Sequence, residues 1–320
     1  MKSRLWVFII FFGQYLLLSS TAGAEEVFIG NPGKSLNFFP LRLGDREGLF
    51  QGTRLRRQAD QHQVRHRYHG SFDRRFASHG LRGFSLAFYR QPECARAHRD
   101  LAVQKPTFYV VARPDIKSAA DLKGKTIGIS SFGSDTDLSM KVFAQSGKLD
   151  PEKDMKRIVA GATSTRLQGL KAGSIDATTL SPPFNVYAEQ IGRRVLAYVG
   201  DFLEFPQSGF TISDATLKSK RDLIKRLLRG TLRVLQFTLK NRAETVRFIA
   251  KDYKLQEPIA DKVYSSLLLA MSENGLATDK GLKVMVETLG TAVGKNVDFP
   301  PDRLVDYTLL REVQKETGVQ

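Results

Sequence analysis

Three histidines stand at a spacing that could hold a metal ion. His66 and His69 follow His62 by four and seven residues, so a helix would bring the three imidazoles to one face. No carboxylate pattern accompanies them, and the single cysteine, Cys94, excludes a cysteine-based zinc finger. We therefore expect no metal and no cofactor.

Motifs of catalysis are scarce in this chain. The nucleophile elbow G-x-S-x-G does not occur. Residues 124–126 (GKT) look like the end of a phosphate-binding loop, but Ala119 stands where the first glycine of that motif belongs, and a strand begins at Thr126 where the motif needs a helix. All five histidines lie between residues 52 and 100. We expect a binding protein and not an enzyme.

Hydroxyl-bearing residues follow several predicted strands. In an open parallel sheet, ligands bind outside the carboxyl ends of the strands, and helix N-termini there favour anions. Ser134 and Thr163 could equally be ordinary N-caps, and Asp135 and Asp137 would repel a second anion. The candidate ligand-binding residues are Ser35, Asn37, Gly133, Ser134, Thr163, Ser181 and Asn185.

The elements that must position these loops alternate along the chain. We predict strands at 27–30, 107–112, 126–130, 155–160, 175–180 and 195–199, and helices at 135–145, 163–172 and 184–191. The order predicts an α/β fold with a mostly parallel sheet covered by helices on both faces. From Lys218 onward, leucines keep a 3.6-residue period, which predicts a helical C-terminal part with a solvated basic face.

The first 24 residues have the pattern of a secretory signal peptide. Lys2 and Arg4 precede an apolar run from Leu5 to Leu18, and small residues follow at 22–24. The run is shorter than the ~20 residues that a membrane anchor needs. We expect residues 1–24 to be cleaved and the mature chain to be periplasmic.

Residues 52–100 differ in composition from the rest of the 320-residue chain. They contain 11 arginines, no lysine, no isoleucine and one valine, and they contribute +7 to the formal charge of +16. We expect this stretch to be irregular. It is either a genuine arginine-rich insert that binds nucleic acid or a membrane surface, or the product of a shifted reading frame. We favour the shifted frame, because sliding the codons by one base replaces His and Arg by apolar and β-branched residues.

Several motifs resemble those of a known family. Residues 121–130 (DLKGKTIGIS) look like the lobe-entry motif of periplasmic solute-binding proteins of ABC importers, in the nitrate, sulfonate, taurine and thiamine-precursor-like group. Residues 170–177 (LKAGSIDA) resemble a second motif of that group. Residues 181–183 (SPP) resemble its pocket loop, and residues 48–50 (GLF) resemble the end of its first helix.

The resemblance implies two α/β lobes that close on a small solute without changing it. Lobe 1 would combine residues 25–112 with 205–320, and lobe 2 would be 113–204. Ser35 and Asn37 would contact the solute from lobe 1, and Gly133, Ser134, Thr163 and Ser181 from lobe 2. The partners would be a permease and an ATPase, and the chain would be a monomer that binds no nucleic acid.

Two alternatives remain beside this interpretation. One branch of the same fold is an enzyme that makes a pyrimidine precursor with cysteines and a histidine, and its cysteine cluster is absent from this sequence. The other alternative is a surface or nucleic-acid-binding module built on the arginine-rich stretch 52–100. The nature of the solute, which is expected to be anionic or like a sulfonate, taurine or a pyrimidine, is not readable from these residues.

Overall fold

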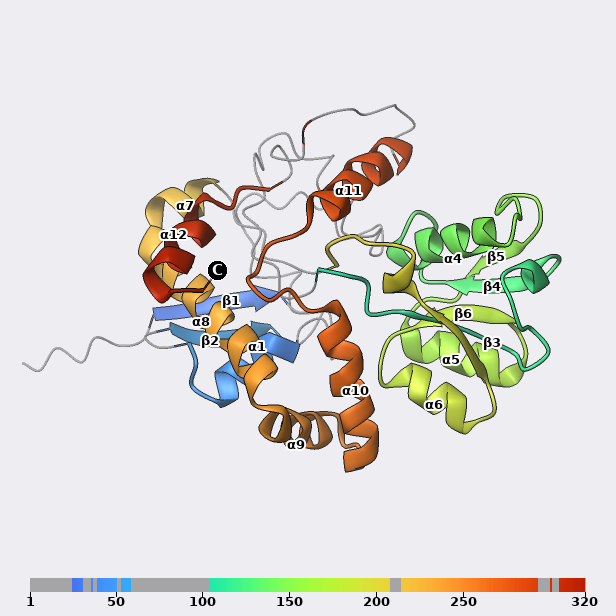
Figure 1. Cartoon of the computed structure of the whole chain (residues 1–320), viewed down its shortest axis with the longest axis horizontal. Helices are drawn as coiled ribbons and strands as arrows, with labels where there is room; N and C mark the ends of the chain where they lie inside the picture. The colour runs from blue at the N-terminus through green and yellow to red at the C-terminus, as the bar shows by residue number, and fades with distance from the viewer. Residues whose placement is uncertain are drawn as a thin grey trace, which may run out of the picture.

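The chain folds into two bodies. The computed structural model describes residues 25–30, 36, 39–50, 53–58, 104–207, 214–292, 300 and 305–319. We call residues 109–201, on the right in Figure 1, the sheet lobe, and the mainly helical body on the left the helical lobe. In the described ranges no helix combines the length and apolarity needed to cross a membrane. The predicted signal peptide, residues 1–24, lies outside these ranges.

A five-stranded sheet forms the centre of the sheet lobe. Its strands are β3 (Tyr109–Ala112), β4 (Thr126–Ile129), β5 (Lys156–Val159), β6 (Ala177–Leu180) and β7 (Arg194–Tyr198), in the order β5-β4-β6-β3-β7. β4 pairs in parallel with β5 and β6, whereas β3 is antiparallel to β6 and β7. Four strands therefore share one direction, and the predicted mostly parallel sheet is confirmed with β3 as its reversed member.

Helices cover both faces of this sheet. They are α4 (Asp135–Ser146), α5 (Thr163–Ala172) and α6 (Phe184–Gln190), with short 3-10 turns η3 (Ala120–Leu122) and η4 (Val199–Asp201). Successive side chains of a strand point to opposite faces. Val110 accordingly packs with Met140 of α4, and Val111 packs with Leu170 of α5. The carboxyl ends of β4, β5 and β6 thus lie together, and the predicted polar loops emerge from that edge.

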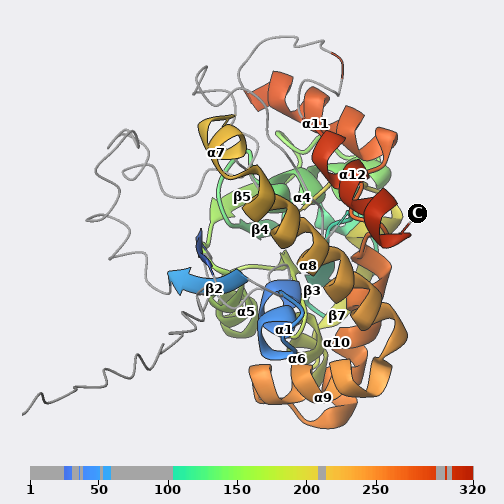
Figure 2. The ribbon, with the colours of Figure 1, turned by 90° about the vertical axis from the view of Figure 1, so that its left-hand side faces the viewer.

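The helical lobe has a two-stranded parallel sheet and most of the helices. Its elements are β1 (Glu25–Gly30), α1 (Phe39–Arg46), β2 (Thr53–Gln58), α7 (Asp214–Ser219), α8 (Arg221–Lys240), α9 (Arg242–Tyr253), α10 (Glu257–Ala270), α11 (Asp279–Ala292) and α12 (Thr308–Thr317). α8 buries its leucine stripe, and α1 and α12 pack on opposite sides of it (Figure 2). β2 corrects the expectation of an irregular stretch at residues 53–58, because backbone pairing with β1 needs no particular side chain. Residues 59–100 lie outside the described part of the chain.

Phe50 fills the contact between α1 and α8. A methyl group added to Gly230 would lie 2.2 Å from Cδ1 of Phe50, and one added to Gly44 would lie 2.4 Å from its Cε2. The ring is buried in the same core as Phe39 and Leu232. The helices therefore approach this closely only because both positions lack a side chain.

Two chain passages, residues 104–108 and 202–207, connect the lobes. Thr107 donates its N–H and its hydroxyl to Oε1 of Gln207, at 2.8 and 2.9 Å. The Val199 N–H donates to the Phe108 carbonyl at 2.9 Å. The Tyr109 hydroxyl, at the end of β3, donates to Oγ of Ser266 on α10 at 2.9 Å. The passages thus run side by side, at the edge of the sheet where the polar loops lie (Figure 1).

Candidate functional site

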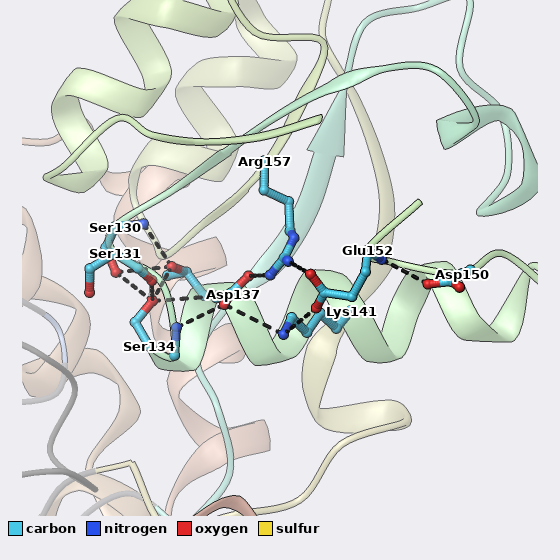
Figure 3. A network of polar contacts seen from close by, with 10 residues as sticks. Ser130, Ser131, Ser134, Asp137, Lys141, Asp150, Glu152 and Arg157 are labelled. Atoms are coloured by element: carbon cyan, nitrogen blue, oxygen red, sulfur yellow. Dashed lines mark hydrogen bonds and ion pairs between the residues drawn. The ribbon is translucent and has the colours of Figure 1, made fainter. Parts of the chain in front are cut away.

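A hydroxyl cluster closes the loop between β4 and α4 (Figure 3). Ser134 is the N-cap of α4 and accepts the N–H of Asp137 at 3.3 Å. Its hydroxyl donates to the Ser131 carbonyl at 2.6 Å and accepts from the Ser130 hydroxyl at 2.9 Å. The capping role predicted for Ser134 is confirmed, and its side chain is fully engaged within the loop.

The carboxylate of Asp137 occupies the anion position at the start of α4. Gly133 adopts a left-handed conformation at φ +73° and donates its N–H to Oδ2 of Asp137 at 2.8 Å. Oδ1 of the same carboxylate lies 2.6 Å from Nη1 of Arg157, which also pairs with Glu152. Both side chains are buried, and Figure 3 shows the ion pair between them. The donors that were predicted to receive a solute anion here are used by the chain's own carboxylate.

The start of α5 has a different arrangement. Ala162, and not Thr163, is the N-cap, and it provides no side-chain cap. Thr163 is the first helical residue, and its hydroxyl accepts from Nη2 of Arg166 at 3.3 Å. The capping role considered for Thr163 is therefore wrong, because the chain turns into the helix one residue earlier. No described side chain accepts the first N–H groups of α5.

Arg166 is a buried cation at this helix start. Its side chain donates to the Thr179 carbonyl from Nε at 3.2 Å and from Nη2 at 3.1 Å, and to the Gly161 carbonyl from Nη1. The residue is 2% exposed, and burial lowers the pKa of the guanidinium to about 10. The contacts tie the first turn of α5 to the end of β6, two residues before Ser181.

Arg166 differs from Arg42 and Arg157, whose side chains are also buried, because it has no acidic partner among the described residues. Arg42 lies 2.7 Å from a carboxylate oxygen of Asp252, and Arg157 lies 2.6 Å from Asp137. Arg166 forms no ion pair with any residue in the described part of the chain. Because a buried charge is costly without a counter-charge, this position favours an anion.

Ser181 and Asn185 follow β6, and neither side chain has a hydrogen bond to the part of the chain that the structure describes. Asn185, in the first turn of α6, is 5% exposed, and its Oδ1 is buried without a hydrogen bond. The carbonyl of Ser181 accepts the Phe184 N–H at 2.9 Å, but its hydroxyl makes no hydrogen bond to the described residues. Buried polar groups are normally paired, so among the predicted residues that the structure describes these two side chains have hydrogen-bonding groups available to a ligand.

The remaining predicted residues lie outside the part of the chain that the structure describes. Ser35 and Asn37 lie outside the described residues, although Leu36 between them is fully buried in the helical core. The histidines and Cys94 are outside as well. Within the described ranges, no cluster of three or more His, Cys, Asp or Glu side chains could hold a metal ion.

Sequence reasoning missed Arg166 and Gln207. A signal for Arg166 was present, since it precedes the inward-facing Leu170 by four residues and so lies on the buried side of the helix. A charged residue on the buried side of a helix indicates either an ion pair or a ligand-binding site. Gln207 lies in a passage without periodicity, and nothing in its local sequence indicates burial.

Comparisons with known proteins agree with this architecture. Residues 101–245 match the model of the family described as NMT1/THI5 like. Among curated proteins nothing matches the chain. The solved structures with a similar fold include binding proteins and one enzyme.

Three of these structures indicate the range of functions that proteins of this fold have. The alkanesulfonate-binding protein SsuA from Xanthomonas axonopodis pv. citri, bound to MOPS, is 15% identical with a TM-score of 0.62, and the match covers 90% of this chain and 97% of that one. The periplasmic nitrate-binding protein NrtA from Synechocystis PCC 6803 is 14% identical with a TM-score of 0.66, over 93% and 89% of the two chains. The desulfurization enzyme DszB is 12% identical with a TM-score of 0.63, over 92% and 99%.

These matches extend over nearly the whole chain, including both lobes and the passages between them. At identities this low, the similarity establishes the fold and does not identify the ligand. The resemblance found in the sequence is thereby confirmed: the chain matches the NMT1/THI5 like family over residues 101–245, and it has the two-lobed fold of the type II periplasmic binding proteins.

Proposed function

We propose that this protein is the periplasmic substrate-binding component of an ABC importer and that it captures a small anionic solute between its lobes. The observation that indicates an anionic solute is Arg166, a buried guanidinium without a carboxylate partner in the described residues. Its guanidinium donates to the Thr179 carbonyl of β6, two residues before Ser181, and Asn185 in the next helix has a buried Oδ1 without a hydrogen bond in the described part of the chain.

The mechanism is capture without chemical change. A solute that touches both lobes stabilises the closed arrangement by its higher affinity for that state. In the sheet lobe, the positive field of Arg166 and the uncapped start of α5 attract the anion, and Thr163, Ser181 and Asn185 contact it. Gly133 and Ser134 form the wall of the site and donate no hydrogen bond to the solute, because Asp137 and Ser131 already accept from them.

The surrounding system follows from the same proposal. Lobe 1 (25–112 and 205–320) and lobe 2 (113–204) move as units about the two passages. The closed monomer delivers the solute to a membrane permease, and a cytoplasmic ATPase drives its release. Residues 1–24 direct the chain to the periplasm and are removed there.

Isothermal titration of the purified protein tests the proposal. Methanesulfonate, taurine and nitrate are the anionic probes, and methanesulfonamide is the neutral control of similar shape. We expect at least one anionic probe to bind and methanesulfonamide not to bind. Mass spectrometry of the recovered probe is expected to show it unchanged. Binding of the neutral control alone, or conversion of the probe, would contradict the proposal.

A further inference from the structure

Gln207 holds the two passages together with one end of its carboxamide. Its Oε1 accepts both the N–H and the hydroxyl of Thr107. Because a backbone N–H can only donate, this contact fixes which atom of the carboxamide is oxygen and which is nitrogen. Nε2 therefore points away from Thr107.

Nε2 of Gln207 is a buried donor without an acceptor among the described residues. The residue is 7% exposed, and Nε2 has neither solvent contact nor a hydrogen bond in the described part of the chain. Leaving such a group unpaired costs free energy. The neighbouring polar group of the same passage, the Glu204 carboxylate, is by contrast satisfied by the Thr278 hydroxyl of the helical lobe.

The position of this donor is at the junction of the lobes. In the first passage, the Gln104 N–H donates to the Ala270 carbonyl at the end of α10, at 2.8 Å. Tyr109, two residues beyond Thr107, reaches Ser266 of the same helix. Gln207 thus lies between the edge of the sheet where the free polar side chains are and the helical lobe.

We infer that Gln207 is a solute-binding residue: its Nε2 donates a hydrogen bond to an acceptor oxygen of the bound solute. This inference rests on the proposed function and adds a requirement to it. The solute carries an oxygen acceptor at the end that faces the passages, as a sulfonate, nitrate or carboxylate does. The carboxamide then connects the solute, through its own Oε1, to the backbone of the opposite passage, and this contact couples binding to the hinge.

The test compares two variants that each replace a glutamine by glutamate. Gln207→Glu keeps an oxygen for the Thr107 N–H and replaces the donor by an acceptor, so it repels a solute oxygen. Gln145→Glu adds the same charge at an exposed position of α4 and controls for charge alone. Methanesulfonate, taurine and nitrate are titrated into each variant at pH 8. We expect Q207E to lose about tenfold or more in affinity and Q145E to stay within about twofold of the wild type.

The outcomes separate this inference from the proposed function. Equal affinities of Q207E and the wild type would overturn the inference and leave solute capture standing. A wild type that binds none of the three probes would overturn both. A lower pH is expected to restore part of the Q207E affinity, because the protonated carboxyl is again a donor. A loss that is purely structural would not recover in this way.

If Q207E does not fold, a measurement on the wild-type protein tests whether Gln207 contacts the solute. Glutamine side chains labelled with nitrogen-15 are followed by NMR during the titration. One side-chain NH2 pair protected from solvent exchange is expected, and its signal should shift when the probe binds. Binding without a shift of any protected NH2 pair would overturn the inference.

Discussion

The N–H of Gly133 donates to Oδ2 of Asp137 at 2.8 Å, and it thereby gives the first turn of α4 an internal anion. Arg157 neutralises that carboxylate from the neighbouring strand β5. The start of α5, by contrast, has a buried arginine and no carboxylate. Two loops of similar composition are therefore electrostatically different, and only the second is suited to an external anion.

Asp137→Ala is expected to destabilise the protein by about 2–4 kcal/mol, because it removes the buried ion-pair partner of Arg157 and leaves the exposed Glu152 as its one remaining acidic partner among the described residues. Urea unfolding measures this loss. Added sulfate should restore more stability to the variant than to the wild type, since the vacated donors then face an anion from solution. Asp222→Ala is the matched control, because Asp222 is an exposed acid in the first turn of α8. Equal responses of both variants to sulfate would contradict the interpretation.

Arg166→Met is expected to weaken binding of an anionic probe by about tenfold or more, because it removes the buried positive charge while keeping much of the side-chain volume. The Thr179 and Gly161 carbonyls also lose their donors, so a stability loss of about 1–3 kcal/mol accompanies it. Arg193→Met is the control, since Arg193 donates to the Leu170 and Lys171 carbonyls in the same way but is more exposed. Titration calorimetry and urea unfolding check the two effects, and equal affinity losses in both variants would contradict a specific role.

Asp135→Asn is expected to stabilise the protein at pH 7.5 and to have little effect near pH 4. Burial raises the pKa of the Asp135 carboxyl from its ordinary 3.8 to about 6. The ionised form is thus disfavoured in the folded state, so the destabilisation from this group grows as the pH rises from about 4 to about 6 and stays constant above that. The side chain is partly exposed, so we expect a gain of about 1–2 kcal/mol. Thermal unfolding at both pH values measures it, and a gain that is equal at both would contradict this origin.

Gly230→Ala is expected to destabilise the protein by about 1–3 kcal/mol, although alanine is the better helix former. The added methyl would lie within 2.2–2.8 Å of the Phe50 ring, which is buried between α1 and α8. Gly169→Ala is the control, because the contact nearest to the new methyl there is the Ser174 hydroxyl at 3.2 Å. Urea unfolding should show little loss for G169A, and similar losses in both variants would contradict the packing argument.

Much of the fold could be predicted from the sequence because its signals are local. The helix predicted at 163–172 has these bounds in the structure, and the leucine period from Lys218 onward gives α8 and the helices after it. The reversed direction of β3 could not be predicted, because it depends on the pairing of β3 with β6 and β7 across long separations. Strand β2 was missed because its charged sequence, TRLRRQ, has no apolar alternation.

The candidate site was predicted less completely, since its chemistry depends on contacts between distant residues. Hydroxyl-rich loops were visible in the sequence, but the pairing of Asp137 with Arg157 was not, because 20 residues separate them. The same holds for Gln207, whose partner Thr107 is 100 residues away. Ser181 and Asn185 were predicted as site residues from their position after a strand, where loop position alone is informative, and their role in binding stays a prediction.

The hydrogen bond from the Val199 N–H to the Phe108 carbonyl has a consequence for where the sheet lobe begins and ends in the chain. It brings the two ends of the sheet lobe next to each other, as in a domain that has been inserted into a surface loop of another. Residues 104–207 accordingly contain all five strands of the sheet, with every backbone pairing between them, in one continuous stretch. Leu282, Met285, Val286 and Val305, which lie outside that stretch, complete the core beside α4, so a fragment with these limits would expose part of it.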